Sequence, residues 1–505
     1  MKRRNESQQG VEGRSPGGEA ARSPLNTIFR SNFVSAEATS LLPTFITETE
    51  LSIVSSLCQI YLINAVPTRS WKRGNVVNST QVNWETEGKK KMQGRMIDWW
   101  TAGTVTLLTL LIYAAFFWKI NWVRNTKENV NSRRTRYAGA GNRKVGKLPP
   151  VYPNGWFGLL ESRQLKRGEV KHVAALGENF AVFRTEKGDV KILHAYCPHL
   201  GANIGEGGKV KGDCLECPFH SWLFRGDDGQ CQNIPYTKKV PESANTKAWK
   251  CCEVNRIIFV WYHAESADPY WQIEPIEKIA NGAWWDHGRN EYFINCHIQE
   301  IPENGADMAH FSAVHGPGIF FNNSLWGFLR HSWTDATWST KMSRTLASDE
   351  PIEKLETTIC NGDHSSENHR ATGTLKHSTI FFGRYSMLEL KVTAKQIGPG
   401  YVEMWIDTRF GQMCILQTVT PFGPLSQRVT HTIFASPFLG PYAKIVLLGE
   451  CIMFERDMAV WNHKKFLKRP VLVREDRAIS AFRRWFEQFY TANSPTYEST
   501  MALDW

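Results

Sequence analysis

The sequence has no even, closely spaced set of cysteines. Its 11 cysteines are scattered over 505 residues, which argues against a disulfide-rich scaffold and favours a reducing compartment. An apolar run that follows the N-terminus closely enough to form a conventional signal peptide is also lacking. The length, by contrast, suffices for two or three domains with a substantial hydrophobic core.

Most of the chain has no excess of basic residues, although the formal net charge of the whole protein is +11. Residues 1–150 carry 22 Lys and Arg against 10 Asp and Glu, whereas the remaining residues carry 38 against 39. The body of the protein is therefore close to neutral, and we expect no nucleic-acid binding. A basic surplus confined to the N-terminal third is better explained by a membrane surface.

The stretch Trp99–Trp118 contains no charged residue. As a helix it reaches about 30 Å, the thickness of the hydrocarbon layer of a bilayer, and tryptophans stand at both of its ends. We therefore predict a transmembrane helix at residues 97–118, with a buried core helix as the alternative. More Lys and Arg follow the stretch than precede it. This favours a single-pass protein of the endoplasmic reticulum or another endomembrane, with a cytosolic C-terminal body.

The segments on either side of this helix are less informative. Residues 1–95 begin with a polar stretch that is expected to be disordered, and Leu51–Val66 is apolar but short for a membrane span, which predicts a surface-lying or buried helix. Asn78 opens an Asn-Ser-Thr triplet, a candidate for lumenal glycosylation. Residues 119–150 are predicted to form a basic linker.

The remaining chain predicts an α+β protein. Short β-rich runs separated by turn residues fill residues 151–265, a pattern typical of a small antiparallel β-domain. Residues 266–490 mix strand-like and helical stretches, which suits a second domain of the α+β class. Residues 491–505 are assigned to a tail.

The stretch CPHLGANIGEGGKVKGDCLECPFHSW, residues 197–222, places one cysteine and one histidine in each of two loops. In zinc modules, two cysteines usually lie close together in one segment and two histidines in another, so a structural zinc site is the weaker alternative. One Cys and one His from each loop suit a Rieske [2Fe–2S] cluster, in which one iron takes both thiolates and the other both imidazoles. The candidate ligands are Cys197, His199, Cys217 and His220. Cys214 is interpreted as a structural neighbour.

A second group of metal-binding residue types lies in ENGADMAHFSAVH, residues 303–315. His310 and His315 are about one and a half helical turns apart, so both can face one metal if the helix bends or ends between them. Two histidines with one carboxylate form the facial triad of non-haem Fe(II) sites that activate O₂. Asp307 precedes His310 by three residues and can approach its imidazole as a hydrogen-bond acceptor.

Together, Cys-x-His-x₁₇-Cys-x₂-His and Glu-x₃-Asp-x₂-His-x₄-His resemble the catalytic component of the Rieske non-haem iron oxygenases, over roughly residues 150–490. The resemblance implies a β-rich Rieske domain joined to a catalytic domain with a helix-flanked antiparallel sheet. It also implies homotrimers in which one subunit's cluster lies beside the next subunit's iron. Asp307 would then bridge His220 of one chain and His310 of its neighbour.

The third iron ligand in this family is a carboxylate well downstream of the histidines. The stretch FERDMAVWNHKKF supplies two candidates, of which Asp457 is preferred and Glu455 is the alternative. An exposed acid on a charged helix is the competing interpretation of either residue.

The membrane segment and the stretches ENGADMAHFSAVHG, TPFGPLSQRVTHTIF and FERDMAVWNHKKFLKRP are similar to the animal cholesterol 7-desaturases. This resemblance implies conversion of cholesterol to 7-dehydrocholesterol, an early step of ecdysteroid and steroid-hormone synthesis. Electrons would come from NAD(P)H through a separate reductase or ferredoxin-type donor, and pass through the cluster to the iron. The motif alone does not decide between desaturation and hydroxylation. A Rieske monooxygenase acting on another sterol, lipid or amine, and an electron-transfer protein with an inactive second site, remain as alternatives.

Overall fold

The computed structural model describes residues 84–124, 147–316, 329–340 and 367–502, with side chains in the first range from Trp100 onward. The expectations for Leu51–Val66, for Asn78 and for most of the basic linker fall outside the described residues. The chain divides into two units, Met1–Met92 and Gln93–Trp505. The second unit holds every element discussed below except the first turns of one helix.

That helix is α2 (Trp84–Phe116), and it contains most of the predicted membrane segment. Its part Trp100–Phe116 is apolar, and large side chains along it, among them Leu107 and Leu111, are exposed. This exposure argues against the core-helix alternative. Among the described helices, the stretch that is long and apolar enough to cross a membrane is a different one, Pro437–Trp461, and that stretch packs partly inside the body. The helix predicted at residues 97–118 is thus present, whereas its insertion into a membrane remains a proposal.

The first part of the body consists of three small sheets. Their strand orders are β10-β5-β4-β3, β11-β12-β2 and β6-β7-β8-β9, and all paired neighbours are antiparallel. The predicted β-domain is therefore observed. Its strands are β2 (Gly155–Glu161), β3 (Val170–Ala175), β4 (Glu178–Arg184), β5 (Val190–His194), β6 (Lys209–Lys211), β7 (Cys214–Glu216), β8 (Leu223–Arg225), β9 (Cys231–Asn233), β10 (Ala248–Trp249), β11 (Cys251–Val254) and β12 (Ile257–Tyr262).

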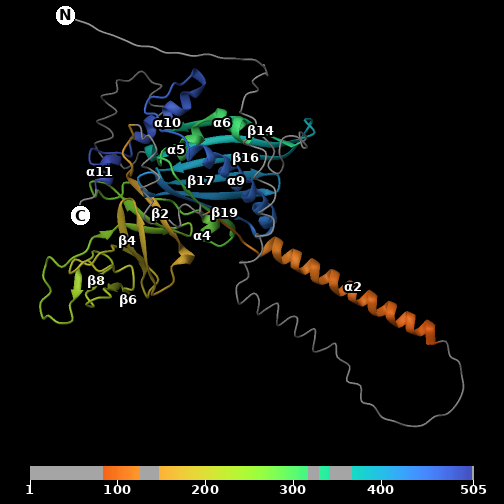
Figure 1. The fold of residues 1–505 in the computed structure, drawn as a ribbon, viewed down its shortest axis with the longest axis horizontal. Coiled ribbons are helices and arrows are strands. Elements are labelled where there is room, and N and C mark those ends of the chain that lie inside the picture. The colour runs from red at the N-terminus through yellow and green to blue at the C-terminus, as the bar shows by residue number, and fades with distance from the viewer. Residues whose placement is uncertain (1–83, 125–146, 317–328, 341–366, 503–505) are drawn as a thin grey trace, which may run out of the picture. The chain divides into compact units, whose positions relative to one another are not determined.

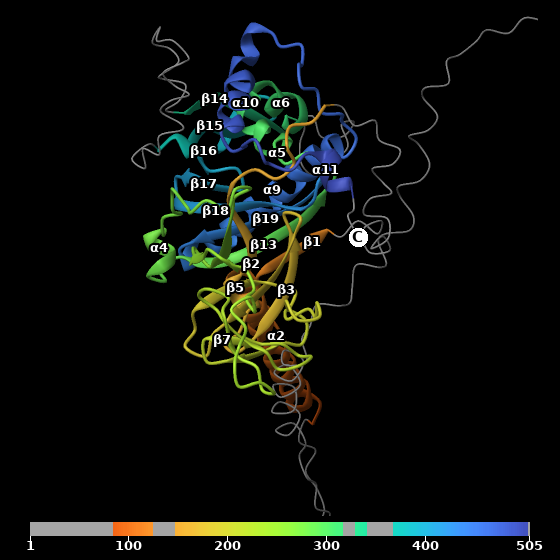
Figure 2. The same cartoon turned by 90° about the vertical axis from the view of Figure 1, so that its left-hand side faces the viewer.

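The second part of the body is built on one eight-stranded sheet, in the order β1-β13-β19-β18-β17-β16-β15-β14. Figure 2 shows the strands from β14 to β13 stacked in this order. Neighbouring strands are antiparallel except for β1 and β13, which run parallel. The strands are β1 (Ile120–Arg124), β13 (Trp285–Ile294), β14 (Leu329–Thr340), β15 (Arg370–Phe381), β16 (Tyr385–Ile397), β17 (Tyr401–Thr408), β18 (Gly411–Gly423) and β19 (Ser426–Ala435).

Helices flank this sheet, as the family resemblance implied. The α-helices are α4 (Glu277–Ala280), α5 (Glu300–Glu303), α6 (Met308–His315), α9 (Gly440–Trp461), α10 (Arg477–Glu487) and α11 (Tyr497–Met501), and the 3₁₀ turns are η2 (Ser162–Gln164), η3 (Asn304–Ala306), η4 (Glu367–His369), η5 (Pro437–Leu439) and η6 (Arg474–Asp476). The longest of them, α9, packs against β13 and β19 (Figure 1). Its buried stripe recurs every three or four residues, as expected for a helix with one face on a core: Ala443, Leu447, Cys451, Phe454, Asp457 and Trp461.

Two segments differ from their sequence assignments. Ile120–Arg124, assigned to the basic linker, forms the edge strand β1, because its backbone finds a free edge at β13. Residues 491–505, assigned to a tail, carry α11 and contact the β-domain. The hydroxyl of Thr491 donates to Glu265 at 2.6 Å, and the amide of Val151 donates to the carbonyl of Pro495 at 2.8 Å.

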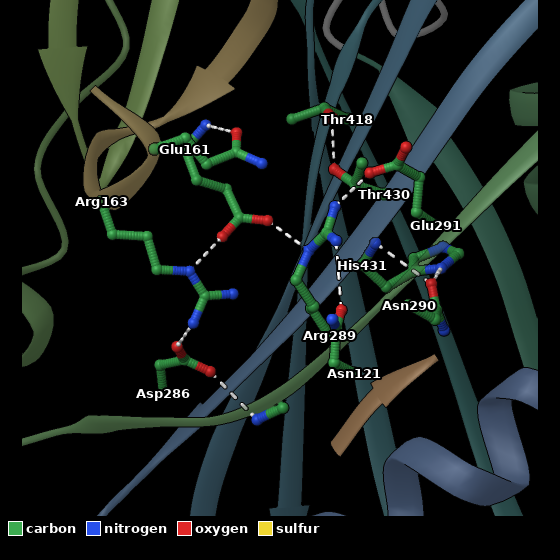
Figure 3. Close-up of polar contacts among 12 residues, drawn as sticks. Asn121, Glu161, Arg163, Asp286, Arg289, Asn290, Glu291, Thr418, Thr430 and His431 are labelled. Carbon is green, nitrogen blue, oxygen red and sulfur yellow. Dashed lines mark hydrogen bonds and ion pairs between the residues drawn. The ribbon is translucent and has the colours of Figure 1, made fainter. Parts of the chain in front are cut away.

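An ion-pair network joins β1, the end of β2 and β13 (Figure 3). The guanidinium of Arg289 contacts Glu161 and Glu291 and donates to Asn121 Oδ1 at 3.2 Å. Arg163 contacts Glu161 and also Asp286 of β13, which links the network to the large sheet. Since the network joins the chain that follows α2 to both parts of the body, it fixes β1 on the sheet edge.

Candidate active site

Two loops of the β-domain carry the predicted cluster ligands, and they share one backbone pattern. In each loop the amide of the cysteine, Cys197 or Cys217, donates to the carbonyl five residues later, and its own carbonyl accepts from the amide four residues later. The residue at that fourth position has a positive φ, +71° at Gly201 and +57° at Ser221. Glycine adopts this conformation without strain, whereas serine does so at a cost. The two loops are therefore matching turns, each presenting one Cys and one His.

The four side chains gather at the tips of these turns. Cys197 and Cys217 are buried, and the imidazole centroids of His199 and His220 are 4.7 Å apart. The indole of Trp222 stacks on His199 at 4.7 Å with an interplanar angle of 8°. Burial raises the pKa of the Cys197 thiol to about 11, and neighbouring Cys217 adds to this rise. A bound metal would counter the rise, because it stabilises the thiolate form.

The donor set fits a two-iron cluster better than zinc. Nδ1 of His199 is buried without a hydrogen-bond partner in the protein, which leaves that nitrogen for a metal ligand. Donor atoms around one zinc ion would all lie within about 4 Å of one another. Among the described residues, the one group of three or more His, Cys, Asp or Glu with all ligand atoms within 4.8 Å of one another lies elsewhere. The thiol of Cys214 donates to Gln232 Oε1 at 3.0 Å, as expected for a structural neighbour.

Asp307 caps the start of α6 and orients His310, the first candidate iron ligand. Its carboxylate Oδ1 accepts from the amides of Ala309 at 3.1 Å and His310 at 3.2 Å, which makes Asp307 the N-cap of the helix. Its backbone carbonyl accepts from Nδ1 of His310 at 2.5 Å. Because Nδ1 is occupied, Nε2 of His310 is the nitrogen left to bind a metal. Burial lowers the pKa of His310, which favours the neutral imidazole that a metal requires.

The fold brings His310, His315 and Asp457 together. Their ligand atoms all lie within 4.8 Å of one another, and Nε2 of His315 is 3.3 Å from Oδ2 of Asp457. His315 is the last residue of α6, so the helix ends after the second histidine and not between the two, which differs from the condition expected from the sequence. Nδ1 of His315 is buried without a hydrogen-bond partner. Two imidazoles and one carboxylate at this distance could hold one metal ion.

Glu455, the alternative carboxylate, lies on another face of α9. Its Oε1 accepts from Nε of Arg124 at 3.0 Å and from the indole of Trp122 at 3.1 Å, so the side chain is engaged with β1. Asp457 instead belongs to the buried stripe of α9, three residues after Phe454 and four before Trp461. An acid on an otherwise apolar helical stripe is the sequence signal that distinguishes the two candidates.

A cavity of about 430 Å³ adjoins this group, between α6, α9 and the strands β14 to β18. Its wall is largely apolar and includes Phe311, Trp333, Leu390, Ile406 and Phe454. Phe381 of β15 and Met404 of β17 also contribute to this wall. The cavity therefore has the size and character of a site for an apolar small molecule.

A few polar side chains in the wall were not predicted from the sequence. Nδ1 of His331 and Nε2 of His377 are 2.8 Å apart, and burial lowers the pKa of each imidazole to about 4. Burial raises the pKa of Glu450, two turns before Asp457 on α9, to about 7. Isolated histidines and an acid within a helix carry no spacing signal, so only their position in the cavity identifies them.

Comparison with known proteins agrees with this arrangement. Residues 155–244 match the Rieske [2Fe-2S] domain, and residues 260–490 match the 3-ketosteroid 9alpha-hydroxylase C-terminal domain. The oxygenase component of a probable 3-ketosteroid-9-alpha-monooxygenase from Rhodococcus rhodochrous is 30% identical over 68% of this chain and 82% of that protein. A crystal structure of dicamba monooxygenase bound to dicamba is 16% identical over 68% of this chain and 98% of that one, with a TM-score of 0.49, too distant to support an argument.

Animal relatives are more similar. Cholesterol 7-desaturase nvd of Xenopus laevis is 44% identical over 72% of this chain and 77% of that protein. Cholesterol 7-desaturase nvd of Drosophila melanogaster is 40% identical over 80% of this chain and 94% of that protein. With this identity and coverage, and with both candidate metal sites present, the chain belongs to the cholesterol 7-desaturase family of Rieske oxidoreductases.

Proposed function

We propose that the protein converts cholesterol to 7-dehydrocholesterol with O₂ and electrons from NAD(P)H, at an early step of steroid-hormone synthesis. The observation that carries the proposal is the group His310, His315 and Asp457 beside a largely apolar cavity, in a chain with a Rieske domain. The relatives named cholesterol 7-desaturase support the choice of substrate and reaction.

Each predicted site residue has a proposed role. When bound, the two metal groups supply single electrons and the activation of O₂. The four loop ligands would hold the [2Fe–2S] cluster, and the triad of α6 and α9 would hold one Fe(II). The ligand assignment is Cys197, His199, Cys217 and His220 for the cluster, and His310, His315 and Asp457 for the iron. Asp307 would connect the two sites, and its contacts at the start of α6 hold His310 in the orientation that ligation needs.

The cavity would position the substrate. A sterol is a rigid, flat hydrocarbon with one hydroxyl group, and a cavity with apolar walls and few polar groups is complementary to it. The rings of Phe311 and Trp333 pack at 5.5 Å between centroids beside the proposed iron ligands. This apolar part of the wall would hold the B ring at the metal and exclude water from the reaction.

Membrane attachment and assembly belong to the same proposal. The exposed apolar part of α2, Trp100–Phe116, would insert into the endoplasmic reticulum or another endomembrane as a single span, with the body in the cytosol. Leu200 and Phe219, one in each cluster loop, are exposed. Such an apolar surface suits a neighbouring subunit, and we propose the homotrimer in which that subunit's iron receives the electron.

Hydroxylation is the second candidate reaction. The match of residues 260–490 to a steroid hydroxylase domain favours it, because the same site could leave an alcohol in place of a double bond. An electron-transfer role without catalysis requires an inactive second site, and the gathered triad argues against that role.

The deciding experiment supplies deuterium-labelled cholesterol to membranes that contain the full chain and an active reductase. Mass spectrometry then reads the product. Loss of two hydrogens with a new conjugated diene supports desaturation, whereas gain of one oxygen indicates a hydroxylase. Unchanged cholesterol beside a reduced cluster would overturn the proposal of a sterol substrate.

A further inference from the structure

The cavity opens to the surface between α9 and β16. Ile445 of α9 lines the cavity and is nevertheless 64% exposed, and Leu388 of β16 lines it and is 43% exposed. Side chains that border both the cavity and the solvent mark an opening. Tyr442 and Val446 continue the wall inward from Ile445 on the same helix.

Exposed apolar side chains lie in the turns at this end of the sheet, where β15 meets β16, β17 meets β18 and β19 leads into α9. Phe410 is 61% exposed and packs edge-on against Tyr442 at 5.6 Å, and Phe438, in the turn before α9, is 89% exposed. Phe382, in the turn between β15 and β16, is 70% exposed. We call the following residues the mouth surface: Phe382, Met387, Leu388, Phe410, Phe438 and Ile445. Exposed apolar residues gathered in this way mark a binding surface.

Two arginines stand beside aromatic residues at this surface. The guanidinium of Arg384 lies 5.8 Å from the ring of Tyr385, and that of Arg409 lies 5.5 Å from the ring of Phe410. Arginine beside an exposed aromatic side chain suits the headgroup level of a bilayer, where the ring meets acyl chains and the cation meets phosphate.

The exposed apolar helix ends against the first turns of α9, the helix that carries Ile445 of the mouth surface. Lys444, next to Ile445, donates from Nζ to the carbonyls of Ala114 at 3.0 Å and Ala115 at 2.7 Å, the last turn of α2. These carbonyls have no partner within the helix, so the lysine caps it. Strand β1 follows directly and is fixed to the sheet edge by the network around Arg289 (Figure 3). The end of α2 is therefore held close to the opening of the cavity.

We propose that the mouth surface rests on the bilayer into which α2 inserts, and that sterol passes from the lipid directly into the cavity. The inference rests on the proposed function for its substrate and goes beyond it by assigning the route of entry. A sterol that took an aqueous route would first have to leave the bilayer, at a cost of about 0.8 kcal/mol for each CH₂ group exposed to water. An opening in contact with lipid avoids this cost.

Photocrosslinking of the full chain tests the proposal. The photoreactive residue p-benzoylphenylalanine replaces Phe438 or Phe382, which do not line the cavity, and Val471 serves as a matched control, since it is 98% exposed in a loop away from the cavity wall. Each variant is reconstituted in phosphatidylcholine vesicles that carry radiolabelled lipid. We expect lipid adducts at 438 and 382 in at least about tenfold excess over 471.

Two results would overturn the inference. Equal labelling at all three positions would mean that the mouth surface faces water, and a crosslink to a second copy of the chain would mean that it is a subunit interface. A parallel reaction with radiolabelled photoreactive cholesterol and the replacement at Ile445 separates this inference from the proposed function. Lipid adducts at 438 without sterol capture at 445 would retain the bilayer contact and reject sterol entry, whereas sterol capture without lipid adducts would retain the substrate and reject the bilayer contact.

Discussion

Oδ2 of Asp457 lies 3.3 Å from Nε2 of His315, although one residue is near the end of α9 and the other ends α6. The contact exists because both helices face the same cavity. It completes the one group of three metal-binding side chains with ligand atoms within 4.8 Å among the described residues. The contact favours Asp457 over Glu455 as the third candidate iron ligand, although the two acids are only two positions apart in the sequence.

Asp457→Ala should remove the mononuclear iron and retain the cluster. The variant should bind about two irons per chain, against about three for the unchanged protein, because a third ligand is lost from one site only. Metal analysis combined with the visible spectrum of the cluster measures both sites. Glu455→Ala is the matched control and should keep all the iron, since Glu455 contacts Arg124. Full iron content in Asp457→Ala would transfer the ligand role to another carboxylate.

His199→Ala should abolish the visible spectrum of the Rieske cluster. The imidazole has a free, buried Nδ1 and a partner imidazole at 4.7 Å, so its loss removes one of two ligands to the same iron. Cys214→Ala is the control within the same domain, because its thiol contacts Gln232. An unchanged spectrum in His199→Ala would reject the cluster assignment, and loss of the spectrum in Cys214→Ala would add a ligand.

Asp307→Asn should lower turnover by about 100-fold while both metal sites remain loaded. Asparagine keeps an oxygen that accepts from the amides of Ala309 and His310, so the N-cap persists and only the negative charge is lost. Single-turnover measurements should show a slower transfer of the electron from the cluster to the iron. Asp307→Ala removes the cap as well and should cost about 1 kcal/mol of stability in addition. Normal turnover in Asp307→Asn would reject the bridging role.

The stability of the fold should fall as the pH drops from about 6.5 to about 4. His297 is fully buried, its Nε2 donates to the carbonyl of Pro150 at 3.1 Å, and its Nδ1 accepts from the amide of Gln299 at 3.2 Å. Burial lowers its pKa to about 4, so in this window the unfolded chain binds a proton that the folded protein does not. His297 alone should contribute a loss of up to about 1.4 kcal/mol per pH unit.

Thermal unfolding of the full chain in mild detergent at several pH values measures this loss. His297→Gln should be less stable than the unchanged protein at pH 7 and should show a shallower dependence on pH, because one titrating group is removed. Buried His431 has a pKa lowered to about 3 and continues to contribute in both proteins. An identical pH dependence in the two proteins would show that His297 titrates alike in the folded and unfolded states.

Residue spacing sufficed to name the candidate ligands that lie close together in the chain. Cys197 and His199 occupy one turn, Cys217 and His220 the next, and a short loop length leaves few ways to separate them. His310 and His315 lie on one helix, so the helical period determines the angle between the directions of their side chains. Residue patterns also predicted the β-domain and an α+β second domain, because strand and helix periods are local properties, whereas the helix-flanked sheet was implied by the family resemblance.

Only the tertiary structure decided what depends on distant parts of the chain. Asp457 and Glu455 differ by about 200° around α9, and the sheet and β1 determine which of them faces the histidines. Ile120–Arg124 was assigned to the basic linker because basic residues follow it in the chain. It forms a strand because the edge of β13 is free to pair with it. The cavity wall is formed by residues of α6, α9 and five strands, which are far apart in the sequence. A local sequence pattern cannot predict such long-range packing, because the neighbours of each side chain are fixed only when helices and strands pack against one another.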